Sequence, residues 1–195
     1  MRVWIFAIFL GLASPTFAAE EIAEIAPTER GPAIGAIIPS NLSSLDHTGQ
    51  PANFDSLVGP NGMVLVFIRS TKWCRFCKMQ LADLATGVDE IEARGYSLIV
   101  LSYDSVKDNT RYVEEYKPGF TILSDRKSEV IDAFGIRNHK YGKMHFAHGV
   151  PHPMIFVIDA DKTIQAKLAE SGYKDRPAIA VVIETLDALP PKDAP

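Results

Sequence analysis

The 195-residue chain is poor in cysteine and has no excess of positive charge. It contains 2 cysteines, too few for a small scaffold held together by disulfides. Its 20 lysines and arginines are outnumbered by 24 aspartates and glutamates, so it lacks the basic surface expected of a nucleic-acid-binding protein. With 47% hydrophobic and 23% charged residues, the composition excludes the disordered and fibrous classes. No internal repeat is evident, and the length fits one domain.

An apolar run at the N-terminus is too short to cross a membrane. Arg2 precedes a run of roughly eleven residues from Val3 to Ala13, and Thr16 to Ala18 resembles a small-residue cleavage site. A spanning helix needs about 20 apolar residues. We therefore predict that residues 1–18 are a cleaved signal peptide, and that no stable membrane span remains afterwards. Export places the protein where disulfides persist, and the bacterial periplasm is the compartment we expect.

Hydrophobic periodicity divides the rest of the chain into three parts. We expect a flexible mature N-terminus over residues 19–34, one domain over 35–189 and a polar tail over 190–195. The domain alternates between continuous apolar runs and helical spacing, then closes with a hairpin and a helix. This order predicts an α/β sandwich with a mixed sheet. The predicted strands are 63–68, 96–102, 120–123, 154–158 and 163–168, and the predicted helices are 76–94, 110–116, 127–134 and 177–189.

The two cysteines lie where the first buried strand gives way to a helix, in the segment Trp73-Cys74-Arg75-Phe76-Cys77. Cys74 is expected at the helix N-terminus, where unpaired N–H groups and the helix dipole stabilise an anion. Its thiol should therefore be exposed, with a pKa below the free value of about 8.5. Cys77 lies one turn later and can reach back to Cys74. The spacing predicts a redox pair in which Cys74 attacks and Cys77 resolves the mixed disulfide.

Three other interpretations of the cysteine pair are weaker. A structural disulfide closing so short a loop would remove little entropy from the unfolded chain. A closed zinc site needs four ligands, and the nearest completing pair, His145 and His148, lies far along the chain. Inert core cysteines fit poorly with Trp73 and the flanking charges, which indicate a surface edge.

The segment from Trp73 to Lys78, Trp-Cys-x-x-Cys-Lys, resembles the thioredoxin active site. The wider frame resembles the redoxin family of alkyl hydroperoxide reductase and thiol-specific antioxidant proteins (AhpC/TSA, peroxiredoxin-like). This resemblance covers about residues 35–189 and implies a thioredoxin-like fold, with a central mixed sheet flanked by helices and an N-terminal β-hairpin extension. The segments that carry it are 39–49, 53–57, 103–105, 123–125, 133–135 and 149–159.

Two positions bear on the reaction. The active-site segment of peroxiredoxins resembles the pattern Pro-x-x-x-Thr-x-x-Cys. Thr71 and Cys74 match the second half of this pattern, but the chain lacks the proline of the first half. Where peroxiredoxins carry a peroxide-binding arginine, this chain has Pro153, the place of the cis-proline in thioredoxin-like reductases; Pro151 is the rival candidate for a cis bond. The resemblance therefore implies the substrate face of a disulfide oxidoreductase in a peroxiredoxin-like frame. The residues expected to line the substrate groove or support the cysteines are Thr71, Trp73, His152 and Pro153.

Histidines gather in the segment before Pro153. We interpret it as a solvated cationic loop, with a copper or zinc site as the alternative because histidine and methionine suit such metals. His152 could contact Cys74 and stabilise its thiolate. The histidines of this segment are His139, His145, His148 and His152.

These observations predict an exported thiol–disulfide oxidoreductase with Cys74 and Cys77 as catalytic residues and no metal or organic cofactor. Its partners would be protein or small-molecule disulfides and a thiol reductant or oxidant. One alternative is a hydroperoxide reductase in which Cys74 becomes a sulfenic acid and Cys77 condenses with it. Another is a copper- or zinc-binding module. Peroxide reduction should be weak beside disulfide exchange, because Pro153 has no hydrogen-bond donor.

Overall fold

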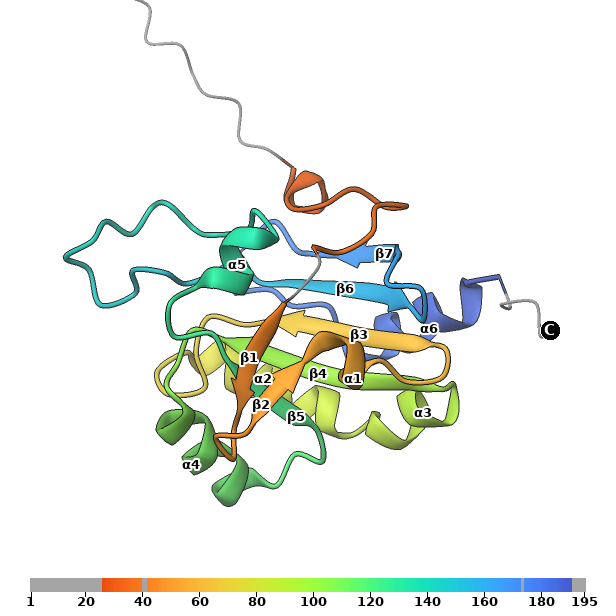
Figure 1. Ribbon diagram of the computed structural model, residues 1–195, viewed down its shortest axis with the longest axis horizontal. Helices are drawn as coiled ribbons and strands as arrows, with labels where there is room; N and C mark the ends of the chain where they lie inside the picture. The colour runs from red at the N-terminus through yellow and green to blue at the C-terminus, as the bar shows by residue number, and fades with distance from the viewer. Residues whose placement is uncertain (1–25, 40–41, 173, 191–195) are drawn as a thin grey trace, which may run out of the picture.

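A mixed seven-stranded sheet forms the centre of the molecule, in the order β2-β1-β5-β4-β3-β6-β7 (Figure 1). The computed structural model describes residues 26–39, 42–172 and 174–190, so the predicted signal peptide (1–18) and nearly all of the predicted tail lie outside it. Strands β3, β4 and β5 are parallel, whereas β1, β6 and β7 run antiparallel to their neighbours. The strands are β1 (Ser43–Asp46), β2 (Pro51–Asn53), β3 (Gly62–Phe67), β4 (Tyr96–Ser102), β5 (Thr121–Ser124), β6 (Met154–Asp159) and β7 (Ile164–Leu168).

Strand β3 lies at the middle of the sheet, between β4 and β6, and is buried along its whole length. Its side chains alternate between two apolar cores: Leu65 and Phe67 face one, and Val64 and Val66 face the other. A strand buried on both faces reads as a continuous apolar run, which is how the sequence predicted it.

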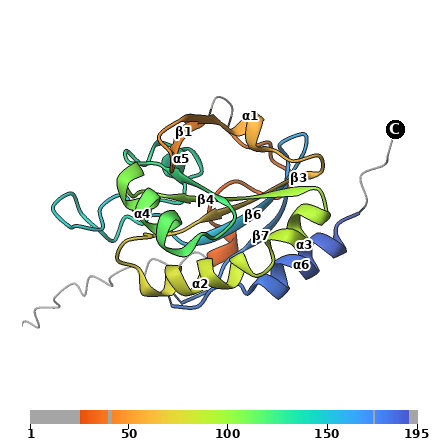
Figure 2. The same cartoon turned by 90° about the horizontal axis from the view of Figure 1, so that it is seen from below.

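Helices cover both faces of this sheet (Figure 2). The core on one face contains side chains of α2, α3, α4 and α6, and the core on the other contains side chains of α1 and α5. The predicted mixed sheet between helical layers and the N-terminal hairpin β1–β2 are therefore both present. The helices are the 3₁₀ helix η1 (Pro27–Glu29), α1 (Phe54–Leu57), α2 (Arg75–Ala85), α3 (Val88–Ala93), α4 (Val106–Tyr116), α5 (Glu129–Ala133) and α6 (Ile179–Ala188).

The helix predicted over 76–94 is two helices, α2 and α3, separated near Gly87. The start of α6 crosses at this point: the Ile179 side chain fills the space where a Cβ on Gly87 would lie. The Asp83 carboxylate accepts a hydrogen bond from the Ile179 backbone N–H at 2.7 Å and so caps α6. The apolar spacing continues through the break because both helices pack on the same core. For this reason the sequence predicted a single helix.

The segment before Gly35, predicted as flexible, is partly described and contains the 3₁₀ helix η1. Gly31, with φ of 75°, lies against the core, and a Cβ there would be 3.1 Å from the Phe156 ring. Further on, Ile37 bridges to Thr163 and covers the free edge beside β7. Ordered structure thus begins earlier than the predicted boundary. No helix in the described part of the chain is long and apolar enough to span a membrane.

Candidate active site

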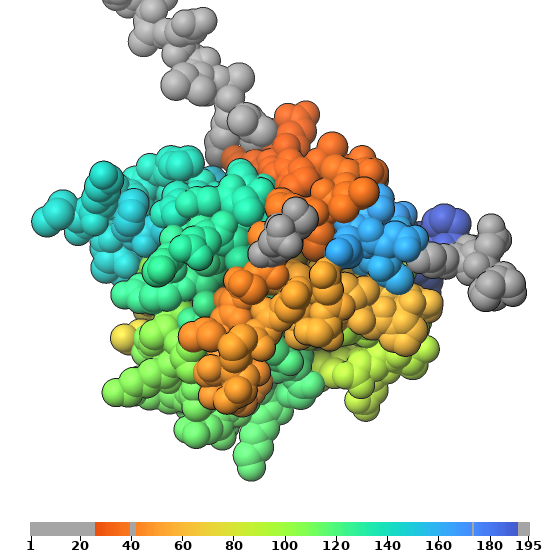
Figure 3. Space-filling model, in the orientation of Figure 1, coloured from red at the N-terminus to blue at the C-terminus, as the bar shows by residue number. Residues whose placement is uncertain are grey.

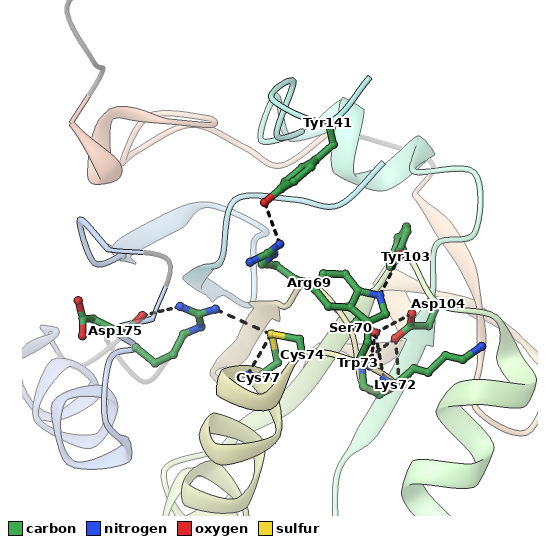
Figure 4. Close-up of a disulfide and its surroundings, with 12 residues drawn as sticks. Arg69, Ser70, Lys72, Trp73, Cys74, Cys77, Tyr103, Asp104, Tyr141 and Asp175 are labelled. Carbon is green, nitrogen blue, oxygen red and sulfur yellow. Dashed lines mark hydrogen bonds between the residues drawn. A yellow bond between two sulfur atoms is a disulfide. The ribbon is translucent and has the colours of Figure 1, made fainter. Parts of the chain in front are cut away.

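The two cysteines form a disulfide at the start of α2, with their Cα atoms 5.2 Å apart (Figure 4). Cys74 is the N-cap of the helix, and its Sγ accepts a hydrogen bond from the Cys77 backbone N–H at 3.2 Å. The sequence placed Cys74 at this helix start correctly. An N-cap sulfur lies next to the unpaired N–H groups and the positive end of the helix dipole, an environment that stabilises negative charge.

Both cysteines are buried: 4% of Cys74 and none of Cys77 is exposed. The expectation that Cys74 is an exposed residue is therefore wrong for this oxidised form. The disulfide belongs to the apolar core between the sheet and α2, alongside Ile68, and Trp73 packs against that core. Large partners have little direct access to the sulfur atoms in this state.

The loop before Cys74 is held by a buried carboxylate. Asp104, which follows β4 and is 5% exposed, lies 3.0 Å from Ser70 Oγ and accepts the Thr71 backbone N–H at 2.6 Å. Burial raises the pKa of Asp104, and these hydrogen bonds oppose that rise. The Thr71 hydroxyl is 3.0 Å from Asp104 and 2.9 Å from Asn109 Oδ1, and only 1% of the residue is exposed. Thr71 therefore fixes the loop from inside, and it does not line the cavity that contains His152 and Pro153.

Trp73 links the cysteine loop to the segment before β6. Its indole N–H donates to the Tyr103 hydroxyl at 3.0 Å, and its ring lies edge-on to Phe146 with 5.2 Å between centroids. The Arg69 guanidinium lies 4.9 Å from the Trp73 ring centroid and donates to the Tyr141 hydroxyl at 2.9 Å. Figure 4 shows the Arg69 guanidinium directed toward Tyr141, whereas the Lys72 side chain extends away from the disulfide.

A second arginine reaches the disulfide from the segment between β7 and α6. The Arg176 Nη2 atom lies 3.9 Å from Cys77 Sγ. Burial, and then the nearby charge of Arg69, lower the pKa of Arg176 to about 10, while Asp175 opposes this shift. Two guanidinium groups from distant parts of the chain thus converge beside the cysteine pair.

A cavity of about 530 Å³ adjoins this arginine pair. Arg69, Arg176, His152 and Pro153 all line it, so two of the predicted groove residues do share a pocket. Neither cysteine lines the cavity, and Arg176 stands at its wall in contact with Cys77.

The expected cis-proline is absent from the described residues, where every peptide bond is trans. Pro151 instead forms a bridge with Arg137, and the His152 N–H donates to the Ile136 carbonyl at 2.7 Å. These contacts hold the segment extended along the chain that follows α5.

Comparisons with known proteins agree with this geometry. The AhpC/TSA family model matches residues 34–167, more than half of the chain. The chain belongs to the AhpC/TSA family.

Several curated proteins and solved structures are similar to this chain. Peroxiredoxin Bcp of Escherichia coli strain K12 is 29% identical over 131 residues, covering 67% of this chain and 81% of the relative. 1-Cys peroxiredoxin PER1 of Hordeum vulgare is 37% identical over 102 residues, covering 49% of this chain and 45% of the relative. The crystal structure of peroxidoxin BcpB from Mycobacterium tuberculosis superposes with a TM-score of 0.68 at 20% identity, covering 80% of this chain and 97% of that one. The predicted family, thioredoxin-like α/β fold and oxidoreductase class are confirmed.

The histidine-bearing loop of this AhpC/TSA domain stands out from the body of the molecule (Figure 3). The His145 ring Nδ1 accepts the Ala147 N–H at 3.0 Å, and the His148 ring lies 3.0 Å from the Tyr141 carbonyl. Across the described ranges, no group of three or more His, Cys, Asp or Glu residues could hold a metal ion. The copper or zinc alternative therefore finds no ligand set there.

Arg176 is the site residue that sequence reasoning missed. It lies 99 positions after Cys77, and no motif surrounds it. Pro177, the next residue, indicated where the last helix begins. Only the packing of that helix against α2 shows that Arg176 reaches the cysteines. Arg69 is one of the charges that flank the motif in the sequence, but its contact with the Trp73 ring depends on the folded structure.

Proposed function

We propose that the protein is a thiol-dependent hydroperoxide reductase in which Cys74 reacts with the peroxide and Cys77 resolves the product. The Cys74 thiolate attacks one peroxide oxygen; an S–O bond forms, the O–O bond breaks, and the alcohol or water leaves with a proton. Cys77 then attacks the sulfenic sulfur and releases water. A Cys74–Cys77 disulfide at the helix start is the product that this sequence would leave, and it is the observation that supports the proposal. Similarity to proteins named peroxiredoxins supports it.

The arginine pair favours peroxide reduction over disulfide exchange. The sequence argument against a peroxidase rested on Pro153, which replaces the family's arginine with a residue that has no donor. Arg69 and Arg176 bring guanidinium donors to the same neighbourhood from other elements. Donors aimed at developing negative charge lower the barrier to breaking the O–O bond. The burial of Cys74 also suits a small peroxide better than a folded protein.

Thiol–disulfide exchange with another protein is the second candidate. It is favoured by Trp73, which flanks the disulfide and gives the segment its likeness to thioredoxin. Under this alternative the oxidised pair accepts electrons from a substrate dithiol, or the reduced pair donates them to a substrate disulfide.

Rapid mixing of the reduced protein with hydrogen peroxide, followed by Trp73 fluorescence, separates the two candidates. We expect peroxide to oxidise the protein far faster than it oxidises free cysteine, and Cys74→Ser to abolish the reaction. Arg176→Gln should slow it by roughly 10²–10³, the usual effect of losing one preorganised donor, whereas Lys72→Gln should not. Peroxide oxidation at the rate of free cysteine, together with rapid exchange with protein disulfides, would support the second candidate instead.

Export to the periplasm is part of the same proposal. It is supported by the charged start, apolar run and small-residue site of residues 1–18. Expression of the full chain in a bacterial host should give a mature protein that starts at Ala19 in the periplasmic fraction. Recovery of the uncleaved chain in the cytoplasm would contradict export without affecting the chemistry.

A further inference from the structure

The cavity beside the disulfide carries more positive than negative side chains. Its volume of about 530 Å³ is within the range of small-molecule sites. The cations come from three separate parts of the chain and from the histidine-bearing loop. The basic residues that line it are Arg30, Arg69, Lys140 and Arg176, and the acidic ones are Glu170 and Asp175.

Arg69 is a fixed element of this cavity. Only 8% of the residue is exposed, its Nη2 donates to the Tyr141 hydroxyl at 2.9 Å, and its guanidinium stacks on Trp73. A guanidinium held in one orientation loses little further freedom when it binds an anion. Its planar fork matches a carboxylate, with which it forms two parallel hydrogen bonds.

Arg69 and Arg176 also act on each other. Burial, and then the like charge of Arg69, lower the pKa of Arg176 to about 10, so the protonated form of Arg176 is destabilised in this setting. A negative group bound in the cavity would reduce this repulsion. Because Arg176 is 3.9 Å from Cys77 Sγ, an anion held there would lie close to the disulfide.

We propose that this cavity binds the carboxylate of a small thiol that reduces the Cys74–Cys77 disulfide. The inference rests on the proposed function in one respect, namely that the disulfide is an intermediate that must be reduced in each cycle. The structure is that of the oxidised protein, and the next reactant of an oxidised protein is its electron donor. In the oxidised half of the cycle the cavity is therefore assigned to the electron donor, whereas the same two guanidinium groups act on the peroxide in the reduced half.

The chemistry balances with two thiols for each disulfide. The first thiolate attacks Cys74 Sγ; a mixed disulfide forms, the Cys74–Cys77 bond breaks, and Cys77 leaves as a thiolate beside Arg176. A second thiolate attacks the sulfur of the bound thiol in the mixed disulfide and releases Cys74 as a thiolate. Two electrons pass to the protein, solvent supplies two protons, and the two thiols leave as their own disulfide.

The test compares thiols of different charge on the oxidised mature protein. Reduction is followed by Trp73 fluorescence with 3-mercaptopropionate, 2-mercaptoethanol and cysteamine, and each rate is divided by the thiolate concentration. We expect the carboxylated thiol to react at least about tenfold faster than the neutral one, and the cationic thiol to be slowest. 3-(Methylthio)propionate, which has no thiol, should inhibit reduction by 2-mercaptoethanol, whereas the corresponding alcohol should not.

Three variants test which side chains cause the preference for the carboxylated thiol. Arg69→Gln should remove the preference for the carboxylated thiol, and Arg30→Gln, at a more accessible wall of the cavity, should weaken it. Lys72→Gln removes the same charge from outside the cavity, where Lys72 pairs with Asp108 at 3.3 Å, and should keep the preference. If Arg69→Gln does not fold, Arg30→Gln and inhibition of the unchanged protein still decide the question.

Equal rates for the three thiols, or an equal loss of preference in Lys72→Gln, would overturn the inference. A preference for carboxylated hydroperoxides in the oxidation step, without one for thiols in the reduction step, would also overturn it and assign the cavity to the peroxide. A protein that shows the thiol preference but is not oxidised by peroxide would refute the proposed function alone. Rapid oxidation by peroxide without any thiol preference would refute only this inference.

Discussion

Replacing Asp104 should loosen the loop that precedes Cys74. Its carboxylate accepts the buried Thr71 N–H at 2.6 Å and lies 3.0 Å from each of the Ser70 and Thr71 hydroxyls. Leaving one buried donor unsatisfied costs about 1–3 kcal/mol. In Asp104→Ala the Thr71 N–H loses its acceptor, while the Thr71 hydroxyl keeps Asn109. We expect the free energy of unfolding to fall by about 1–3 kcal/mol, because one buried donor is left unsatisfied. Removing a buried charge offsets part of this loss.

The raised pKa of Asp104 sets the direction in which the free energy of unfolding depends on pH. Burial raises the pKa of Asp104 in the folded protein above the unfolded value of about 3.9, so the folded state binds this proton more tightly. The stability that Asp104 contributes is therefore fully present below the unfolded pKa and is lost as pH rises through the folded pKa. Compared with Asp104→Asn, the unchanged protein should have its largest advantage in acid. Asp125, whose pKa burial also raises, is common to both proteins and cancels.

Urea unfolding of the unchanged protein, Asp104→Asn and Asp104→Ala at several pH values between acid and neutral measures both effects. Asp108→Asn is a suitable control, because that carboxylate is more accessible and its pKa is lowered by Ser105 and Lys72 against the opposing effect of burial. A loss below about 0.5 kcal/mol in Asp104→Ala would place the variant among ordinary surface substitutions and refute the argument. An advantage over Asp104→Asn that grows as pH rises would show that the sign is wrong.

Three further predictions concern the cysteine helix. Cys77→Ser should trap mixed disulfides through Cys74 when the protein is treated with a thiol after oxidation, whereas Cys74→Ser should trap none; equal trapping, seen by intact mass, would reverse the assigned roles. Reducing the disulfide should lower the free energy of unfolding by only about 2 kcal/mol, because the closed loop is so short, and a loss of more than twice that in urea unfolding would contradict this. Leu81→Ala should cost about 2–5 kcal/mol by the same measurement, since Leu81 is fully buried on the core-facing side of α2; a cost below 1 kcal/mol would mean that the site can collapse.

Elements with strong local signals were predictable from the sequence. The short apolar run from Met63 to Phe67 indicated a strand buried on both faces, and β4 has the predicted bounds of 96–102. The cysteine motif lies at the end of the short loop between β3 and α2, so both sulfur atoms could be placed at one end of the sheet. Here the local pattern and the tertiary structure agree, which makes the prediction secure.

Features that depend on contacts between distant segments were not predictable. The break near Gly87 arises because α6 crosses there, and no periodicity in α2 or α3 reveals that crossing. Arg176 reaches Cys77 only because α6 is anchored to Asp83. The burial of Cys74 depends on how the 68–74 loop folds onto Asp104, which lies 30 positions later.

Both cysteines belong to a single turn at the start of α2. Making or breaking their bond changes the covalent structure within four consecutive residues and joins no second strand or helix. The oxidised and reduced proteins should therefore present the same outline to other molecules, apart from the immediate surroundings of the sulfur atoms. Storing and releasing electrons should then need no change of shape elsewhere in the fold, and a partner that distinguishes the two states should make contact at the start of this helix.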